Sequence, residues 1–210
     1  MKAKILIIKL WAIGEVALAT PCIGRMKKEL PDSEVYFLVG NNAKDILIGN
    51  PDVSKVFAVD ERIFLKPDLA KLIALTKELR RERFDIVVLL HHNTSFSLFA
   101  FLLGAPKRFG LKRPGEWSLN TSNIVSDGRT SKTVEYLKAL EPLSISSTSD
   151  DVRIAMYPDD EDRKHVVSLM EENGLRRKEF AILSPTGGEN PAAAKFSTNI
   201  RNKLWPLEHY

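Results

Sequence analysis

The 210-residue sequence has one cysteine and no long hydrophobic run. The first excludes an internal disulfide, and the second argues against a membrane-spanning protein. Cys22 cannot form a disulfide within the chain, which fits a reducing compartment and gives no sign of a redox role. The apolar stretches at 5–8 and 98–103 are far shorter than the roughly 20 residues of a membrane span. Lys9 and Glu15 interrupt the only stretch that resembles a secretion signal. We therefore expect a soluble, cytoplasmic protein.

The sequence also lacks low-complexity tracts and blocks of one charge. Its 31 basic and 27 acidic residues are interleaved, giving a net charge of +4 and a pI of about 9.1. This excess is too dispersed for a nucleic-acid track, so no nucleic-acid partner is expected. It suits an anionic small molecule or a phosphorylated lipid headgroup.

Alternating apolar strands and amphipathic helices predict an α/β fold with a doubly wound, parallel, Rossmann-like sheet. The opening run 3–10 is apolar without alternation, as expected of a strand buried on both faces. Gly14 permits a turn into a helix, which Pro31 ends. The later expected strands are 34–40, 55–60, 85–90, 108–111, 152–156 and 180–184. The later expected helices are 43–49, 68–82, 95–103, 131–140 and 159–173.

The last part of the chain contains too little to enclose a core. One strand, a loop and a few helical residues follow position 176, so we expect a domain at 1–175 and the start of a second at 176–210. A piece of a two-domain protein is favoured over a tail that packs on the first domain.

The loops that follow the strands are where ligands of open parallel sheets bind. After the first strand come Lys9, Gly14 and Glu15, which place a carboxylate in the first turn of a helix. That carboxylate either takes a proton from a sugar hydroxyl or caps the helix, and residue chemistry alone favours the cap.

A second polar cluster follows the strand at 85–90. His91 and Asn93 are candidates to hydrogen-bond a substrate, with loop stabilisation as an equal alternative. His91 and His92 point in different directions, so a metal site formed by both is not expected.

Two further candidates lie near the end of the chain. Gly187 and Gly188 let backbone N–H groups approach a phosphate, with Thr186 adding a hydroxyl, although an ordinary surface loop is equally compatible. Lys203 could neutralise a departing diphosphate or be an ordinary solvated lysine. The acidic run 159–162 matches an Asp-X-Asp metal motif but is better explained as a helix start, so no metal is expected.

These segments, in order, resemble the heptosyltransferases of glycosyltransferase family nine. The similar blocks are Lys4–Leu10, Ala12–Val16, Leu18–Pro21, Pro31–Asp32, Leu38–Gly40, Asn50–Val53, Arg80–Asp85, Gly104–Arg108, Val134–Leu137, Pro185–Pro191 and Lys203–Pro206. The resemblance implies a GT-B arrangement of two facing Rossmann-like domains, of which this chain holds the amino-terminal one and the start of the other.

The resemblance also implies an activity and its partners. Such enzymes move heptose from ADP-heptose to an anionic lipopolysaccharide-core acceptor, inverting the anomeric centre without a cofactor or an essential metal. They work in the cytoplasm at the inner face of the inner membrane, with at most peripheral membrane contact. Glu15 matches the catalytic base, while Thr186, Gly187, Gly188 and Lys203 match the diphosphate site.

The sequence departs from the family where it has Glu15 instead of the usual Asp and Leu204 instead of Arg. The extra methylene of Glu15 moves the carboxylate by roughly 1 Å, which can be costly for catalysis. Two alternatives remain: a noncatalytic sugar- or nucleotide-binding relative, and a nucleotide-dependent epimerase or reductase. The missing Gly-X-Gly-X-X-Gly motif speaks against the latter. The 210-residue chain by itself is expected to transfer no sugar.

Overall fold

The computed structural model describes residues 2–146 and 152–182, and the chain divides into two units. The first unit is residues 1–158, and the second begins at Asp159. The candidate residues Thr186, Gly187, Gly188 and Lys203 lie outside the described residues, as do positions 183 and 184 of the last expected strand.

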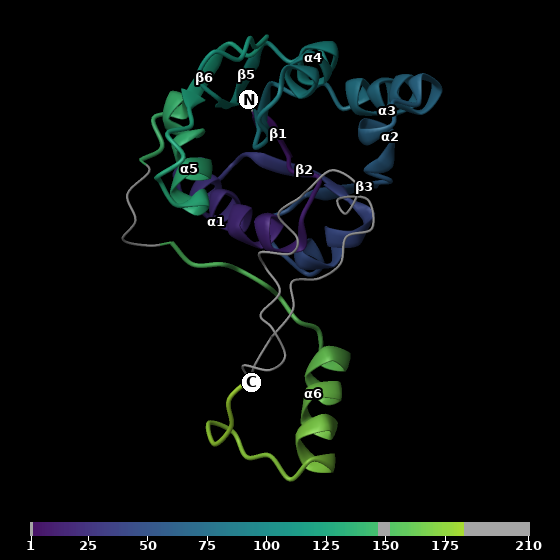
Figure 1. Cartoon of the computed structure of the whole chain (residues 1–210), viewed down its shortest axis with the longest axis vertical. Coiled ribbons are helices and arrows are strands. Elements are labelled where there is room, and N and C mark those ends of the chain that lie inside the picture. The colour runs from purple at the N-terminus through teal and green to yellow at the C-terminus, as the bar shows by residue number, and fades with distance from the viewer. Residues whose placement is uncertain (1, 147–151, 183–210) are drawn as a thin grey trace, which may run out of the picture. The chain divides into compact units, whose positions relative to one another are not determined.

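The first unit is built on a six-stranded sheet in which every neighbouring pair is parallel (Figure 1). The strand order is β3-β2-β1-β4-β5-β6, the order of a Rossmann-like sheet. The predicted doubly wound α/β fold is therefore confirmed. The strands are β1 (Lys4–Ile8), β2 (Glu34–Gly40), β3 (Lys55–Val59), β4 (Ile86–Leu89), β5 (Lys107–Lys112) and β6 (Ser122–Val125).

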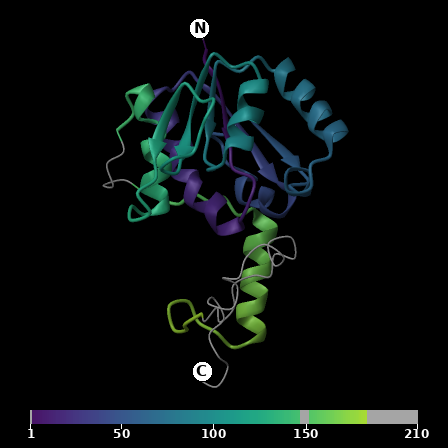
Figure 2. The ribbon, with the colours of Figure 1, turned by 45° about the horizontal axis from the view of Figure 1, so that its top comes forward.

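Helices cover both faces of this sheet, as Figure 2 shows. On one face lie α1 (Ile13–Glu29), η1 (Asn41–Leu47), α5 (Lys132–Lys138) and η2 (Glu141–Leu143). On the other face lie α2 (Arg62–Leu65), α3 (Leu69–Arg81) and α4 (Thr94–Leu102). No helix in residues 2–146 and 152–182 is both long and apolar enough to cross a bilayer.

The unbroken apolar run of β1 explains its central position. Ile5 and Ile7 pack in the core under α1, while Leu6 and Ile8 pack in the core under α3 and α4. Because side chains alternate between the two faces of a strand, a strand covered on both faces must be apolar at every position. All four side chains are fully buried.

Close backbone approach fixes the strand ends next to β1. A Cβ on Gly40 would come within 2.4 Å of the Leu10 carbonyl oxygen, which accepts a 2.9 Å hydrogen bond from the Gly40 N–H. Only glycine fits there without moving the backbone. The end of β2 thereby holds the start of the loop that follows β1.

The second unit contains α6 (Asp160–Glu172), which confirms that the acidic run begins a helix. The Asp159 carboxylate accepts from the Asp162 N–H, and the Asp162 carboxylate accepts from the Asp159 N–H, forming a capping box. Gly174, with φ of 62°, follows the helix end. The stripe at Val166 and Val167 is about half exposed, so it is not core in the described part of the unit.

Several expectations about secondary structure are wrong. Residues 152–156 form no strand, and neither do the described residues 180–182 of the last expected strand. Both segments are largely exposed and pair with no described strand; Ala155 instead donates its N–H to Thr20 Oγ1 at 3.0 Å. Strand β6 and helix α2 were not expected, because each has only four residues and so carries no readable periodicity. Gly14 lies inside the first turn of α1 rather than in a turn before it.

Candidate functional site

The sheet reverses its strand order between β1 and β4, and the loops that leave these two strands lie side by side. Ligands of open α/β sheets bind in the crevice outside the carboxyl ends of the strands at such a point. The segment after β1 carries Lys9 and leads into the first turn of α1, which carries Glu15, and the loop after β4 carries His91 and Asn93. The topology therefore brings together all the predicted site residues that the structure describes.

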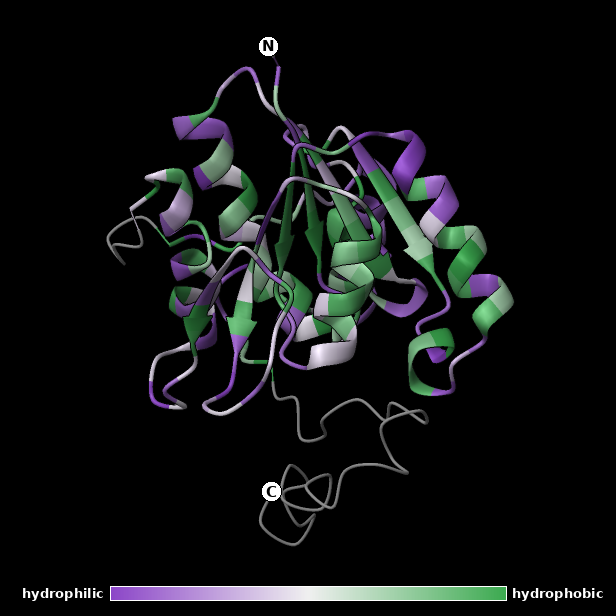
Figure 3. Ribbon diagram, turned by 90° about the horizontal axis from the view of Figure 1, so that it is seen from above, coloured by the Kyte–Doolittle hydropathy of each residue, from purple (hydrophilic) through white to green (hydrophobic). Residues whose placement is uncertain are grey.

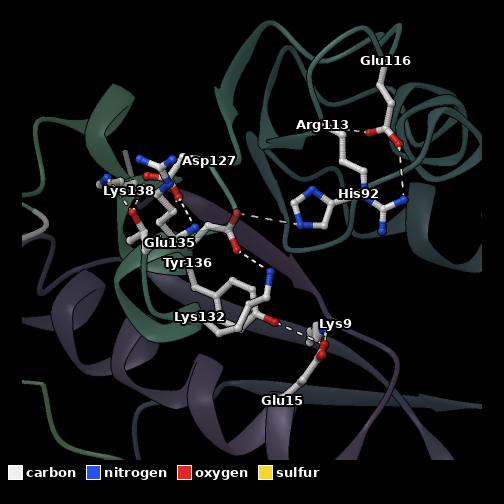
Figure 4. Close-up of polar contacts among 12 residues, drawn as sticks. Lys9, Glu15, His92, Arg113, Glu116, Asp127, Lys132, Glu135, Tyr136 and Lys138 are labelled. Carbon is white, nitrogen blue, oxygen red and sulfur yellow. Dashed lines mark hydrogen bonds and ion pairs between the residues drawn. The ribbon is translucent and has the colours of Figure 1, made fainter. Parts of the chain in front are cut away.

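The Glu15 carboxylate receives two hydrogen bonds at this edge (Figure 4). Lys9 Nζ donates to Glu15 Oε2, and the Tyr136 hydroxyl donates to the same oxygen at 3.3 Å. Glu15 is the third residue of α1, and Tyr136 comes from α5, which packs against α1. The Glu15 side chain is 43% exposed, whereas that of Lys9 is 4% exposed.

This arrangement combines a buried cation with an accessible carboxylate. Burial lowers the pKa of Lys9, and the nearby Glu15 carboxylate opposes that shift. The pKa of Tyr136 is raised by burial and by Glu15, so the tyrosine remains a hydrogen-bond donor at neutral pH. A carboxylate oriented by two donors, and open to solvent, can accept a proton from a hydroxyl that reaches this edge.

The helix-cap interpretation of Glu15 does not match these contacts. Ala12 occupies the N-cap position, and among the described residues the Glu15 carboxylate bonds to Lys9 and Tyr136 rather than to backbone N–H groups. Gly14 precedes it in the helix, exposed, with open space where a Cβ would stand. Packing within the described chain therefore does not require glycine at position 14.

His91 turns away from solvent. It is 5% exposed, and its Nε2 accepts the Leu10 N–H at 2.8 Å. The ring stacks on Phe96 and tilts against Trp11. Burial holds the pKa of His91 well below its usual value, so the ring is neutral and can serve as this acceptor. His91 thus joins the two loops; its contact with a substrate stays a prediction.

Asn93 is the N-cap of α4. Its side-chain oxygen accepts from the Ser95 N–H and the Ser95 hydroxyl, both at 3.0 Å, and its φ is 108°. The side chain is exposed at the sheet edge while stabilising the helix start. Its role as a substrate ligand likewise stays a prediction.

A second polar group lies beside the first and was not singled out from the sequence. Glu135 stands between His92 and Lys132 in Figure 4, 3.9 Å from His92 Nε2 and 2.7 Å from Lys132 Nζ. Burial raises the pKa of Glu135, but hydrogen bonds from Lys132 and Ser126 bring it below its usual value. Burial lowers the pKa of His92, against the influence of Glu135.

This group could have been noticed in part from the sequence. Glu135 is a carboxylate placed among buried residues of a short helix, next to the buried Tyr136. Such a position calls for a partner, because burying an unpaired charge is costly. The partner could not be identified, since His92 lies on a different strand end, 43 residues earlier.

Two other features bear on the choice of site. Among residues 2–146 and 152–182, no three histidine, cysteine or acidic side chains are grouped so that they could hold a metal ion. An open cavity of about 390 Å³ lies along α1, away from Glu15, and is lined by Thr20, Pro21, Gly24, Arg25, Lys28, Leu137, Arg153 and Ala155. It includes none of the predicted site residues.

Comparison with known proteins shows which proteins this chain is similar to. No family model matches the sequence. Lipopolysaccharide heptosyltransferase 3 of Escherichia coli K12 is 25% identical over 151 residues, covering 70% of this chain. The chain is thus similar to lipopolysaccharide heptosyltransferases of glycosyltransferase family 9.

Solved structures of heptosyltransferase-like proteins share the fold over almost the whole chain. A family 9 glycosyl transferase from Veillonella parvula aligns with a TM-score of 0.77 at 23% identity, covering 99% of this chain and 58% of that one. E. coli heptosyltransferase WaaC, solved with ADP, aligns with a TM-score of 0.61 at 14% identity, covering 98% of this chain and 77% of that one. The chain spans only 44% of the curated heptosyltransferase 3.

Proposed function

We propose that this heptosyltransferase-like chain belongs to a protein that transfers heptose, or a related sugar, from a nucleotide-sugar donor to a lipopolysaccharide core or similar glycan, with inversion. The observation that carries the proposal is the Glu15 carboxylate, which is open to solvent at the switch point of the sheet and held by Lys9 and Tyr136. The family relationship supports sugar transfer as the reaction.

In the proposed reaction, an acceptor hydroxyl attacks the anomeric carbon of the donor. The new carbon–oxygen bond forms as the bond to the diphosphate breaks, and the hydroxyl proton passes to Glu15. Lys9 and Tyr136 position that carboxylate, and Gly14 leaves room for the sugar beside it. His91 and Asn93 would shape the same edge, beside the ion pair of Lys132 and Glu135.

The donor would bind through segments that include the last part of the chain. Two structures of E. coli WaaC contain ADP and ADP-2-deoxy-2-fluoro heptose, which supports an ADP-heptose-like donor here. Thr186, Gly187, Gly188 and Lys203 are the proposed diphosphate ligands, within a carboxyl-terminal domain that would begin near position 176. Acting on a core acceptor would place the protein in the cytoplasm, at the inner face of the membrane. The 210 residues alone would then be inactive.

One observation favours a noncatalytic, sugar- or nucleotide-binding protein as the second candidate. The carboxylate of Glu15 is paired with a lysine, and its side chain is one methylene longer than the aspartate usual in the family. A shift of the carboxylate by about 1 Å can lower a rate by about 10²-fold. Under this alternative Glu15 would hydrogen-bond a ligand without taking its proton.

The two candidates are separated by substitutions at position 15 in the complete protein. With ADP-heptose and a purified core acceptor, Glu15→Gln should lower kcat by about 10²–10⁴-fold if Glu15 is the base. Glu15→Asp is the matched variant, and it should retain far more activity than Glu15→Gln because it keeps an ionisable carboxylate. Donor and acceptor affinity should change little in either variant.

The result that would overturn the proposal is equally concrete. If the unsubstituted complete protein binds donor and acceptor but releases no ADP, the binding candidate is correct. If Glu15→Gln turns over as fast as the unsubstituted protein, the protein is a transferase but Glu15 is not its base.

A further inference from the structure

Helix α4 has no charged residue, yet it lies at the surface. Its sequence, Thr94–Leu102, contains three phenylalanines, two leucines and an alanine, and in Figure 3 the helix is green and white throughout, unlike the alternating purple and green of α3. Phe96, Phe99 and Ala100 face the core. Leu98, Phe101 and Leu102 are 46%, 47% and 44% exposed. A helix that is apolar all round is normally buried or in contact with lipid.

The exposed apolar residues of α4 share one face, and the loop beside the first turn of the helix exposes a tryptophan. Positions 98, 101 and 102 share a helical face because they are three and four residues apart. The loop after β5 is hydrogen-bonded along the first turn of α4: Thr94 Oγ1 donates to the Trp117 carbonyl at 2.7 Å, and the Leu119 N–H donates to Ser97 Oγ at 3.2 Å. Trp117 is 64% exposed. We name Leu98, Phe101, Leu102 and Trp117 the α4 patch.

The surroundings of the α4 patch are cationic. No aspartate or glutamate occurs from position 86 to position 115, and the same stretch contains Lys107, Arg108 and Lys112. Arg113 also lies in it, but its charge is paired with Glu116, which precedes Trp117. The Arg108 guanidinium lies 5.3 Å from the centre of the Phe101 ring. Arg80 of α3 donates to the Leu102 carbonyl at 3.1 Å, which adds another cation at the end of α4.

This combination of chemistry indicates one kind of partner. Leucine, phenylalanine and tryptophan side chains enter the boundary between headgroups and acyl chains, while nearby lysine and arginine meet anionic headgroups. A second copy of the chain would bring like charges together, which opposes self-association through this face. We propose that the α4 patch docks on the surface of an anionic phospholipid bilayer. This inference concerns a helical face of the sheet and does not depend on sugar transfer.

Vesicle sedimentation tests the proposal. The purified chain should co-sediment with vesicles of equal parts phosphatidylglycerol and phosphatidylcholine, and much less with phosphatidylcholine alone. The double variant Leu98→Gln/Leu102→Gln should weaken binding to the anionic vesicles by about tenfold or more, because apolar insertion is lost. Raising the salt concentration should weaken binding of the unsubstituted chain, because the headgroup attraction is screened.

Ile48→Gln is the matched control, since Ile48 is 56% exposed but follows η1, which packs on the opposite face of the sheet. Its binding should equal that of the unsubstituted chain, and thermal unfolding should show all variants folded. The proposal is overturned if the unsubstituted chain does not bind anionic vesicles. It is also overturned if the double variant binds them as well as Ile48→Gln does. It is also overturned if the chain is a dimer in solution that the double variant dissociates, because a second copy then covers the patch.

Discussion

The loops after β1 and β4 leave neighbouring strands at the same edge of the sheet, but their polar side chains turn in opposite directions. The β1 loop directs the Glu15 carboxylate toward solvent, with Lys9 buried behind it. The β4 loop directs His91 inward, onto the Leu10 N–H and the Phe96 ring. The polar residues at this edge therefore divide into those that face solvent and those that hold the loops in place.

The largest expected effect on stability comes from replacing His91, the inward-facing residue. His91→Ala should lower the free energy of unfolding by about 2–4 kcal/mol, because it leaves the Leu10 N–H without its acceptor and opens space beside Phe96 and Trp11. Urea unfolding measures the change. His165→Ala, at an exposed histidine of α6, is the control and should stay within about 0.5 kcal/mol. Equal effects of the two substitutions would contradict a structural role for His91.

A smaller effect should appear as pH dependence. Burial lowers the pKa of His91 in the folded state, so below its ordinary value of 6.5 the unfolded chain binds a proton that the folded chain does not. Stability should therefore fall as the pH drops below about 6.5, by up to about 1.4 kcal/mol per pH unit. Urea unfolding at pH 7.5 and pH 5.5 measures this loss.

His91→Gln should reduce that pH dependence, because the amide oxygen can accept the Leu10 N–H but does not titrate. His92, whose pKa is also lowered, should leave a residual slope. An unchanged slope in His91→Gln would show that other groups cause the acid sensitivity.

The smallest effect is expected at Gly14, in the first turn of α1, where a substitution should raise stability instead of lowering it. Gly14→Ala should raise the free energy of unfolding by about 0.5–1 kcal/mol, because alanine is the better helix former and no described atom lies within 4 Å of the new Cβ. In the complete protein the same methyl group should raise KM if a sugar approaches at this point. A stabilised variant with unchanged kinetics would place the substrate elsewhere.

Much of the fold could be predicted because its signals are local. The unbroken apolar run of β1, the cap at Asp68 and the acidic start of α6 each depend on residues close together in sequence. Strand β6 could not be predicted, because Ser122–Val125 is short, half-buried and joins the sheet only by pairing with β5. The prediction of a strand at 152–156 was wrong because apolar residues alone do not make a strand. This segment pairs with no described strand.

The candidate site was predictable as a location but not as a set of contacts. Strand ends and polar loops are visible in the sequence, so Lys9, Glu15 and the cluster beginning at His91 could be selected. Tyr136 could not, because its hydroxyl reaches Glu15 across 121 positions through the packing of α5 on α1.

The sequence by itself determined a parallel, doubly wound sheet, its strand-end loops and its likeness to heptosyltransferases, because periodicity and motif order are properties of neighbouring residues. Only the tertiary structure decided that Glu15 faces solvent beside a buried lysine, that His91 is turned inward, and that α4 exposes one apolar face. Burial and side-chain direction depend on which elements pack together, and that packing joins residues far apart in the chain.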